Sequence, residues 1–305
     1  MKIVIVTGNR SEFGILEKFN SLCSKLGHKT ELLGVEAELD DAYLQTKTFL
    51  DFYQDIDVMF LFGDRREMLG AAIAGYENKN VLLVHHHAGD WTNTNHPDEP
   101  TRDSISLFSH VLFPACESSY SRCGSINFNL RFNHGSIALD GLSKVQSYGL
   151  KEKEVFVLYN PIKEEDGIPL IINALKDIGG GLHVTFIEPN GDEGSERLIE
   201  WYQSQSKFNG IRGARYVSSL ERPNFLSLLK DKNAYFIGNS SAFFIEGSYP
   251  SWNLKERFTH IGKRNKDRNT NDSYGNGSAG KLIIGKIDRL LDKKEEIIKN
   301  HRTFI

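Results

Sequence analysis

Apolar positions recur along this chain with two different spacings, and the two spacings alternate. Lys2–Thr7 and Val58–Phe62 are short, nearly continuous apolar runs, a pattern typical of strands that are buried on both faces. Glu12–Leu26 instead repeats its apolar residues every three to four positions, which predicts an amphipathic helix. The alternation of strands and helices predicts an α/β protein with parallel sheets covered on both faces.

Two such series follow each other along the chain. The predicted strands of the first series are Lys2–Thr7, Glu31–Val35, Val58–Phe62, Asn80–His85 and His110–Ala115, and its predicted helices are Glu12–Leu26, Asp41–Tyr53, Arg66–Tyr76 and Thr101–Phe108. The predicted strands of the second series are Val155–Tyr159, His183–Glu188, Arg215–Val217 and Ala234–Ile237, and its predicted helices are Ile168–Ile178, Gly194–Phe208 and Arg222–Leu229.

The polar, glycine-containing stretch Asp140–Lys153 separates the two series and is the expected linker. We therefore predict two Rossmann-like domains, residues 1–145 and 146–305, with a ligand cleft between them at the carboxyl ends of their strands. Near the end of the chain, Asn269–Gly280 is rich in Asn, Ser and Gly and predicts a loop. Lys286–His301 predicts one charged amphipathic helix, which could also pack back on the first domain.

Composition narrows the class of protein. The 305 residues are 39% hydrophobic and 25% charged, as in a soluble globular protein, and the formal charge of −3 gives no overall attraction to nucleic acid. We expect no membrane span, because no run approaches the roughly 18 apolar residues required. We expect no secretory leader, because the polar Asn9–Glu12 follows the first apolar run where a cleavage site would stand. Cys23, Cys116 and Cys123 show no metal or disulfide spacing, which favours a reducing cytoplasm.

The most informative stretch is residues 236–246. An apolar strand ends at Gly238, the chain turns through Ser240 and Ser241, and a helix is predicted that carries Glu246 about two turns in. The free backbone N–H groups of such a turn suit a phosphate, and a carboxylate beside it suits the paired hydroxyls of a ribose. The same residues are also compatible with an ordinary strand-to-helix connection capped by serine.

In the first domain, candidate residues follow two of the predicted strands. Gly8–Gly14 opens the first helix and places Arg10 where its forked cation could project over the cleft, although the segment could also be a simple capping turn. Asp64 follows the third strand and should point into the cleft. An ion pair between Asp64 and Arg65 at the strand end is the alternative interpretation.

Three histidines and several acids follow the next strand. His85–His87 with Asp90 invite a zinc assignment, but adjacent residues of a strand point to opposite faces, so we predict no metal site. Asp90 is better placed for acid–base chemistry. Asp98 and Glu99 at the next helix start are either caps or partners of Asp64 and Asp90 in a carboxylate cluster. Carboxylates that converge push their pKa values apart, which supplies one acid and one base at neutral pH.

Two further polar segments occur in the second series. Glu188–Asp192 follows a predicted strand, and the basic cluster Gly262–Arg268 follows the turn at residues 236–246. Arginines in such a cluster can grip a pyrophosphate through paired hydrogen bonds. A solvated loop is the alternative for the basic cluster.

Taken in order, these motifs resemble the UDP-N-acetylglucosamine 2-epimerase family, and most closely its hydrolysing branch in sialic-acid synthesis. The family has a GT-B architecture, two Rossmann-like domains with the nucleotide sugar in the cleft, which agrees with the fold predicted from the residues. The segments that carry the resemblance run from end to end of the chain: Val6–Gly14, Leu61–Glu67, Val84–Asp90, Pro97–Arg102 with Ser109 and His110, Pro189–Gly194, Gly238–Gly247 and Ile261–Arg268.

The resemblance implies that Asp64, Asp90 and Asp98 or Glu99 are the catalytic carboxylates. In the family's chemistry a base removes the proton at C2 of the sugar, and UDP leaves from C1 to give a glycal. Water or UDP then adds back and inverts C2. Cationic support of the departing diphosphate lowers the barrier. No metal and no nicotinamide cofactor are expected.

The resemblance also implies a set of residues that bind the UDP-sugar. Ser240, Ser241 and Glu246 would hold the uridine diphosphate, with Glu246 on the ribose, and Arg10 would approach the phosphates. The further residues that we expect to bind substrate are Glu12, Gly14, Arg65, Arg102, Asn160, Asn190, Gly238, Asn239, Arg264 and Arg268.

Three features depart from the family pattern. Asn160 stands where the family has a histidine before proline, and an amide can neither act as an acid nor become a cation. Asp90 ends an Ala-Gly-Asp where the family has Gly-Gly-Glu, and the chain is shorter before Asp57. Two alternatives therefore stay open: a GT-B glycosyltransferase that passes a sugar to an acceptor hydroxyl of a small molecule, a glycan or a modified nucleic-acid base, and an inactive nucleotide-sugar-binding module. A homodimer is compatible with each of these functions.

Overall fold

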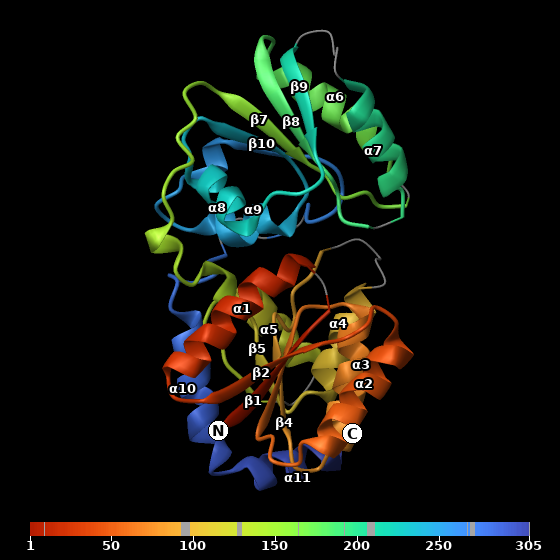
Figure 1. Ribbon diagram of the computed structural model, residues 1–305, viewed down its shortest axis with the longest axis vertical. Helices are drawn as coiled ribbons and strands as arrows, with labels where there is room; N and C mark the ends of the chain where they lie inside the picture. The colour runs from red at the N-terminus through yellow and green to blue at the C-terminus, as the bar shows by residue number, and fades with distance from the viewer. Residues whose placement is uncertain are drawn as a thin grey trace. The chain divides into compact units, whose positions relative to one another are not determined.

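The computed structural model describes residues 1–8, 10–92, 98–126, 130–163, 165–191, 193–205, 211–266, 268 and 272–304. The chain forms two compact units. The first consists of Met1–Trp91, Pro97–Asp140 and Asn271–Ile305, and the second of Thr92–His96 and Gly141–Thr270. The main part of the second unit thus begins at Gly141, within the expected linker, and the C-terminal segment belongs with the first unit. Each unit holds a parallel sheet with helices on both faces, which confirms the predicted α/β class (Figure 1).

The sheet of the first unit has the strand order β2-β1-β3-β4-β5-β6, and its strand pairs are parallel. The order reverses between β1 and β3, so the carboxyl ends of these strands flank the point at which open α/β sheets bind ligands. The strands are β1 (Lys2–Thr7), β2 (Lys29–Gly34), β3 (Val58–Phe62), β4 (Leu82–His86), β5 (Val111–Phe113) and β6 (Leu130–Arg131). The helices are α1 (Arg10–Lys25), α2 (Leu39–Phe52), α3 (Arg66–Glu77), α4 (Asp98–Phe108), α5 (Glu117–Ile126), α10 (Ala279–Leu291) and α11 (Lys294–Phe304), with a 3₁₀ turn η1 (Ile137–Leu139).

The middle of this sheet is buried on both faces, because β3 carries buried apolar side chains at all five of its positions. Figure 1 shows α1 and α10 beside one face and α2, α3 and α4 beside the other. On the second of these faces, Val6 and Leu61 pack in one cluster with Ala71 of α3. On the α1 face, Phe19 packs against Phe60 with ring centroids 4.6 Å apart. The double cover holds the carboxyl ends of β1 and β3 rigidly in place.

The sheet of the second unit has the order β11-β10-β7-β8-β9, again with parallel pairs. Its order reverses between β7 and β10, so the switch point lies where these two strands end. The strands are β7 (Glu154–Leu158), β8 (Leu182–Ile187), β9 (Ile211–Val217), β10 (Ala234–Gly238) and β11 (Phe258–His260). The helices are α6 (Gly167–Ile178), α7 (Ser195–Ser204), α8 (Arg222–Lys230) and α9 (Ser241–Ile245), with 3₁₀ turns η2 (Leu142–Lys144), η4 (Glu246–Ser248) and η5 (Leu254–Glu256).

Helices α6 and α7 lie on one face of the second sheet and α8 and α9 on the other (Figure 1). Val157 and Phe186 pack with Leu175 of α6 and Tyr202 of α7 in one cluster. The rings of Phe186 and Tyr202 stack at 4.8 Å. This packing fixes the loops that leave β7 and β8.

The predicted single helix Lys286–His301 is wrong, because the C-terminal segment forms two helices with a break between Leu291 and Lys294. The first of them, α10, also starts at Ala279 inside the predicted loop, of which residues 269–271 lie outside the described residues. The Asp140 carboxylate caps this start, accepting bonds from the N–H groups of Ala279 at 2.9 Å and Gly280 at 2.7 Å. A cap supplied from so far upstream leaves no local signal in the sequence.

The sequence pattern also misses α5 and the short strands β6 and β11, and it overestimates the helix after β10. The predicted helix Gly194–Phe208 is described as α7 over Ser195–Ser204, and residues 206–208 lie outside the described part of the chain. The helix predicted to carry Glu246 two turns in is wrong, because α9 ends at Ile245 and Glu246 begins a 3₁₀ turn. Among the described residues, no helix combines the length and the apolar composition that crossing a bilayer requires.

Candidate functional site

In the first unit, the guanidinium of Arg102 contacts the carboxylates of Asp64 and Glu99 and the backbone carbonyl of Asp90. Its Nη2 contacts Oδ2 of Asp64, and its Nη1 lies 2.5 Å from the carbonyl oxygen of Asp90 and 3.6 Å from Oε2 of Glu99. The Arg102 side chain is 5% exposed. Asp64 follows β3 and Glu99 lies in the first turn of α4, so the parallel topology brings these residues together. A buried cation among carboxylates favours their ionised forms.

A second acidic cluster lies at the switch point of the same unit, beside the first turns of α1 and α3. Arg65 donates from Nε to Oε1 of the buried Glu67 at 2.8 Å. Glu12, at the start of α1, lies near Arg65, Glu67 and Asp98, and burial raises its pKa to about 8. Burial thus favours the protonated form of Glu12 in the folded protein.

The two glycines at these strand ends are required by the acidic cluster. A Cβ on Gly8 would come within 2.4 Å of the Glu67 side chain, and one on Gly63 within 2.9 Å of Oε1 of Glu12. Gly63 also has a φ of 84°, a conformation that side chains rarely adopt. The predicted residue Gly14 lies within α1, whereas the side chain of Arg10 lies outside the described part of the structure.

Asp90 is held by hydrogen bonds to both of its carboxylate oxygens. Oδ2 faces Nδ1 of His87 at 3.0 Å, and Oδ1 accepts from the hydroxyl of Ser119 at 2.6 Å. Asp90 is 3% exposed. The sequence placed Asp90 at the end of a strand but could not identify Ser119, which comes from α5.

The three consecutive histidines use all six of their ring nitrogens on protein partners. His85 contacts Ser106 and the carbonyl of Gly63, and burial lowers its pKa to about 4. His86 lies between the carbonyl of Phe113 and the N–H of Ile137, and burial lowers its pKa well below the usual value. In the described residues, no three His, Cys, Asp or Glu side chains are grouped so that they could hold a metal ion.

In the second unit, four asparagines interlock at the switch point between β7 and β10. The N–H of Asn160 donates to Oδ1 of Asn239, and Nδ2 of Asn239 donates to the carbonyl of Asn160, both at 2.8 Å. Oδ1 of Asn160 accepts from the N–H of Asn190 at 3.1 Å, and Nδ2 of Asn265 donates to the carbonyl of Asn239 at 2.8 Å. The network joins the loops after β7, β8, β10 and β11.

The turn after β10 has the geometry of a capped helix start. The hydroxyl of Ser240 accepts from the N–H of Ala242 at 3.4 Å, and Ser241 is the first residue of α9. A Cβ on Gly238 would lie 1.8 Å from the carbonyl oxygen of Leu158, so only glycine lets β10 approach β7 here. The turn thus has the predicted position, on a helix of five residues.

Glu246 is buried, with 4% of its surface exposed, and its Oε1 accepts from Nη1 of Arg222 at 2.9 Å. Arg222 is the first residue of α8, and the sequence pattern did not single it out. The positive charge of Arg222 thus offsets the negative charge of Glu246, which lies at the end of the short helix that Ser240 caps.

The basic segment after β11 is held in place by hydrogen bonds to neighbouring residues. Nε of Arg268 donates to Oδ1 of Asn265 at 2.7 Å, and the carbonyl of Arg264 accepts from Nε2 of His260 at 2.7 Å. Glu165, which the sequence pattern did not identify, accepts from the N–H of Lys263 at 2.9 Å and from the hydroxyl of Tyr159 at 3.1 Å. This carboxylate ties the loop after β7 to the loop after β11.

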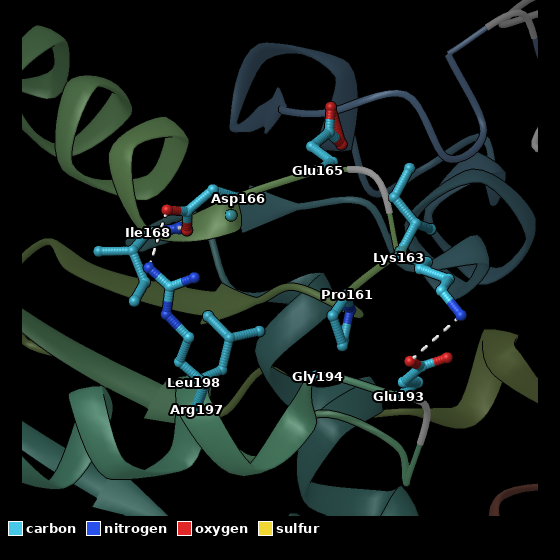
Figure 2. A pocket seen from close by; sticks show the side chains of 11 residues that line it. Pro161, Lys163, Glu165, Asp166, Ile168, Glu193, Gly194, Arg197 and Leu198 are labelled. Atoms are coloured by element: carbon cyan, nitrogen blue, oxygen red, sulfur yellow. Dashed lines mark hydrogen bonds and ion pairs between the residues drawn. The ribbon is translucent and has the colours of Figure 1, made fainter.

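A pocket of about 170 Å³ opens in the second unit beside the loop that follows Asn160. Figure 2 shows two ion pairs across it, Lys163 with Glu193 at 3.5 Å and Arg197 with Asp166 at 2.9 Å. Among the described residues that line the pocket, none is a site residue predicted from the sequence. Its charges are paired with each other, so the pocket carries no assignment.

Comparison with known proteins identifies relatives along most of the chain. A sequence profile of the UDP-N-acetylglucosamine 2-epimerase family matches residues 43–304. A Legionella pneumophila protein named UDP-N,N'-diacetylbacillosamine 2-epimerase (hydrolyzing) is 29% identical over 234 residues, an alignment that covers 71% of this chain and 59% of the relative. The chain thus spans less than two thirds of that relative's length. Polysialic acid biosynthesis protein P7 of Escherichia coli is 26% identical over 330 residues, covering 88% of this chain and 80% of the relative.

The fold is also that of known epimerase structures. The UDP-GlcNAc 2-epimerase of Methanocaldococcus jannaschii, solved in complex with UDP-GlcNAc and UDP, superposes with a TM-score of 0.72 at 14% identity, covering 95% of this chain and 100% of that one. At such low identity the likeness shows the fold alone, and it confirms the predicted GT-B class of two parallel α/β units. Because the family profile covers far more than half of the sequence, the chain belongs to the UDP-N-acetylglucosamine 2-epimerase family.

Proposed function

We propose that this protein is a UDP-N-acetylhexosamine 2-epimerase. The observation that carries the proposal is the gathering of Asp64, Glu99 and the Asp90 backbone around the buried Arg102 guanidinium. Carboxylates held close to one another at the carboxyl ends of parallel strands suit proton removal and return at one carbon atom. Family membership and a relative named as a hydrolysing 2-epimerase support the proposal.

Within this proposal we assign the removal of the C2 proton to Asp64. Its side chain is 22% exposed, whereas that of Glu99 is 11% exposed, so Asp64 is the more accessible carboxylate on Arg102. Asp64 lies against the Arg102 guanidinium, and a neighbouring cation favours the carboxylate form, which is the form that can accept a proton. Loss of the C2 proton and departure of UDP from C1 gives a glycal, to which water adds in a hydrolysing enzyme. Asp90, Asp98 and Glu99 supply the remaining proton transfers.

The second unit would bind the uridine diphosphate. The turn of Ser240 and Ser241 offers hydroxyl and N–H donors, and Glu246 lies under the same turn as a ribose ligand. Asn160, Asn190 and Asn239 would act mainly by holding these loops together, because they hydrogen-bond one another. Arg264 and Arg268 would support the diphosphate charge.

A GT-B glycosyltransferase is the second candidate, and one observation favours it. Asn160 stands where the family has histidine, and its Oδ1 accepts from the N–H of Asn190, so this position neither donates a proton nor carries charge. An enzyme that transfers the sugar to an acceptor hydroxyl needs one base and no acid at this place.

Incubation with UDP-GlcNAc in deuterated water, followed by NMR at C2, tests the proposal. Deuterium at C2 in product or recovered substrate is the expected result, with Asp64→Asn as the inactive comparison. UDP-N,N'-diacetylbacillosamine serves as a second substrate in the same assay. A UDP-sugar that keeps its C2 proton and is consumed only after an acceptor is added would replace the epimerase with the transferase. A UDP-sugar that binds but never reacts would indicate that the protein is an inactive nucleotide-sugar-binding module.

A further inference from the structure

A buried chain of hydrogen bonds runs through Asp90 and away from the Arg102 cluster. Oγ of Ser136 lies 2.8 Å from Nε2 of His87, Nδ1 of His87 lies 3.0 Å from Oδ2 of Asp90, and Oδ1 of Asp90 accepts from Ser119 at 2.6 Å. Each of these four residues is at most 5% exposed. The chain joins β4, α5 and the turn η1 at one carboxylate.

The direction of each bond follows from the donors available. The N–H of Ala138 donates to Oγ of Ser136 at 3.1 Å, so the hydroxyl proton of Ser136 is free to be donated to Nε2 of His87. An imidazole that accepts at Nε2 carries its proton on Nδ1 and can donate it to Asp90. With Ser119 donating to the other oxygen, Asp90 accepts two hydrogen bonds in its ionised form, which that form requires for stability in a buried place.

The backbone is strained where it presents these side chains. His87 has a φ of 65°, uncommon for a residue other than glycine. Gly89 follows with a φ of 73°, and a Cβ there would lie 2.3 Å from the carbonyl of Ser119 and 2.6 Å from the sulfur of Cys123. Strain of this kind persists where the surroundings enforce it, often at functional sites.

Ser136, at one end of this chain of hydrogen bonds, is also held in place by its backbone. The N–H of Ser136 donates to the carbonyl of Tyr274 at 2.8 Å, and a Cβ on the neighbouring Gly135 would lie 2.6 Å from the same oxygen. The ring of His87 also packs 4.9 Å from that of Phe62. The imidazole therefore has one orientation available to it.

We propose that His87, oriented by Ser136, is a positioning residue that keeps the Asp90 carboxylate ionised and aimed for proton transfer. The inference rests on the proposed function, because it takes Asp90 to be one of the reacting carboxylates. His87 itself touches no substrate in this scheme. Because Ser136 is completely buried, the Ser–His–Asp arrangement serves to orient Asp90 and not to present a nucleophile.

Several ionisable groups lie close enough to His87 and Asp90 to influence their protonation. Arg102 and Arg122 approach the Asp90 carbonyl with Nη1 at 2.5 Å and 3.5 Å. The neighbouring ionisable side chains that interact with His87 or Asp90 are His85, His86, Cys116 and Cys123. A pH profile therefore has to be read as a difference between wild type and variant.

The test compares His87→Asn with His87→Ala. Asparagine tolerates positive φ, and its amide can donate to Asp90 as Nδ1 does. We expect His87→Asn to keep kcat for C2 exchange within about tenfold of wild type, and His87→Ala to lose about 100-fold or more in kcat with KM nearly unchanged. In His87→Ala the acid limb of the kcat profile should move to higher pH, because Asp90 has lost a donor to its ionised form. Ser136→Ala should fall between the two, while Ser109→Ala, a matched buried serine whose hydroxyl donates to the carbonyl of Ile105 at 2.8 Å, should match wild type.

Two results would overturn the proposal: a folded His87→Ala enzyme with the kcat and acid limb of wild type, or a His87→Asn enzyme as inactive as His87→Ala. A second readout needs no catalysis. Imidazole nitrogen NMR of the full chain should show His87 protonated at Nδ1, and this signal should move in Asp90→Asn but not in Ser109→Ala. An Nδ1 signal that ignores Asp90→Asn refutes the inference even if the enzyme proves active. If C2 exchange is absent from the wild type, the proposed function fails while the NMR result still decides whether His87 holds Asp90.

Discussion

Asn160 and Asn239 bond each other in both directions, with the N–H of Asn160 on Oδ1 of Asn239 and Nδ2 of Asn239 on the carbonyl of Asn160, each at 2.8 Å. Strands β7 and β10 pair as far as Leu158 and Gly238. Beyond that pair, the Asn239 side chain supplies the two hydrogen bonds that link the chain segments. Asn239 is completely buried, so no water competes for these bonds. The pair of asparagines therefore holds together the loops that leave β7 and β10 in the second unit.

Asn239→Ala should therefore destabilise the protein by about 1–3 kcal/mol, because it leaves a backbone N–H and a carbonyl without partners. Urea denaturation measures the change. Asn78→Ala is the matched control, since Asn78 accepts from the N–H of Asn80 at 2.9 Å on the surface, and it should change the free energy of unfolding by no more than about 0.5 kcal/mol. Equal losses in the two variants would contradict a special role for the buried pair.

Glu246→Ala should weaken UDP binding by about 1–3 kcal/mol, the scale of a hydrogen bond to a charged group. Titration calorimetry of Glu246→Ala, Arg222→Ala and the double variant separates two origins of the loss. If Glu246 holds the ribose, it should cost more affinity than Arg222→Ala, and the coupling from the cycle should be smaller than the Glu246 effect. If the two single variants and the double variant all lose the same affinity, Glu246 acts only through its ion pair.

Asp64→Asn should lower the rate of C2 exchange by about 100- to 10,000-fold, because an amide cannot accept the C2 proton. Asp103→Asn is the control: Asp103 is also paired with an arginine of the same unit, Arg122, through bonds of 2.9 and 2.7 Å, but lies outside the proposed machinery. Steady-state rates of both variants are compared after their folding is checked by thermal denaturation. Similar losses in both would mean that an arginine–carboxylate pair matters for stability and not for the reaction.

Glu12 should make the stability of the protein depend on pH. Burial is the largest cause that raises its pKa from 4.5 to about 8, and its carboxyl therefore stays protonated in the folded protein over a range in which the unfolded chain ionises. The folded state then binds more protons between these two values, so the free energy of unfolding should fall as pH rises through this range. Glu12→Gln, which cannot ionise, should flatten that decline in urea denaturation curves. Parallel pH dependences of the two proteins would show that Glu12 ionises normally.

Activity should survive chelation. The histidine run that suggests zinc has all six ring nitrogens engaged by protein atoms, and the proposed chemistry uses carboxylates as acid and base. C2 exchange measured before and after dialysis against EDTA checks this expectation. Loss of exchange that zinc or manganese restores would require a metal in the reaction.

Local pattern was enough for the long buried strands and for the position of the candidate residues, but not for the short edge strands β6 and β11. Lys2–Thr7 and Val58–Phe62 have the same bounds in the sequence prediction and in the structure, because a strand buried on both faces must be apolar throughout. The parallel class then implies that Asp64 and Asn160 follow strand ends, and they do.

The sequence by itself determined the two parallel α/β units and the edges at which their polar residues lie, since hydrophobic period depends on residues close in the chain. Only the tertiary structure decided which residues meet there. Ser136 reaches His87 from 49 positions away, and Asp140 caps α10 across 139 positions. Arg222 finds Glu246 from a different helix. Such partners are chosen by how the loops of a packed sheet converge, and contacts between distant residues leave no periodic trace in the sequence.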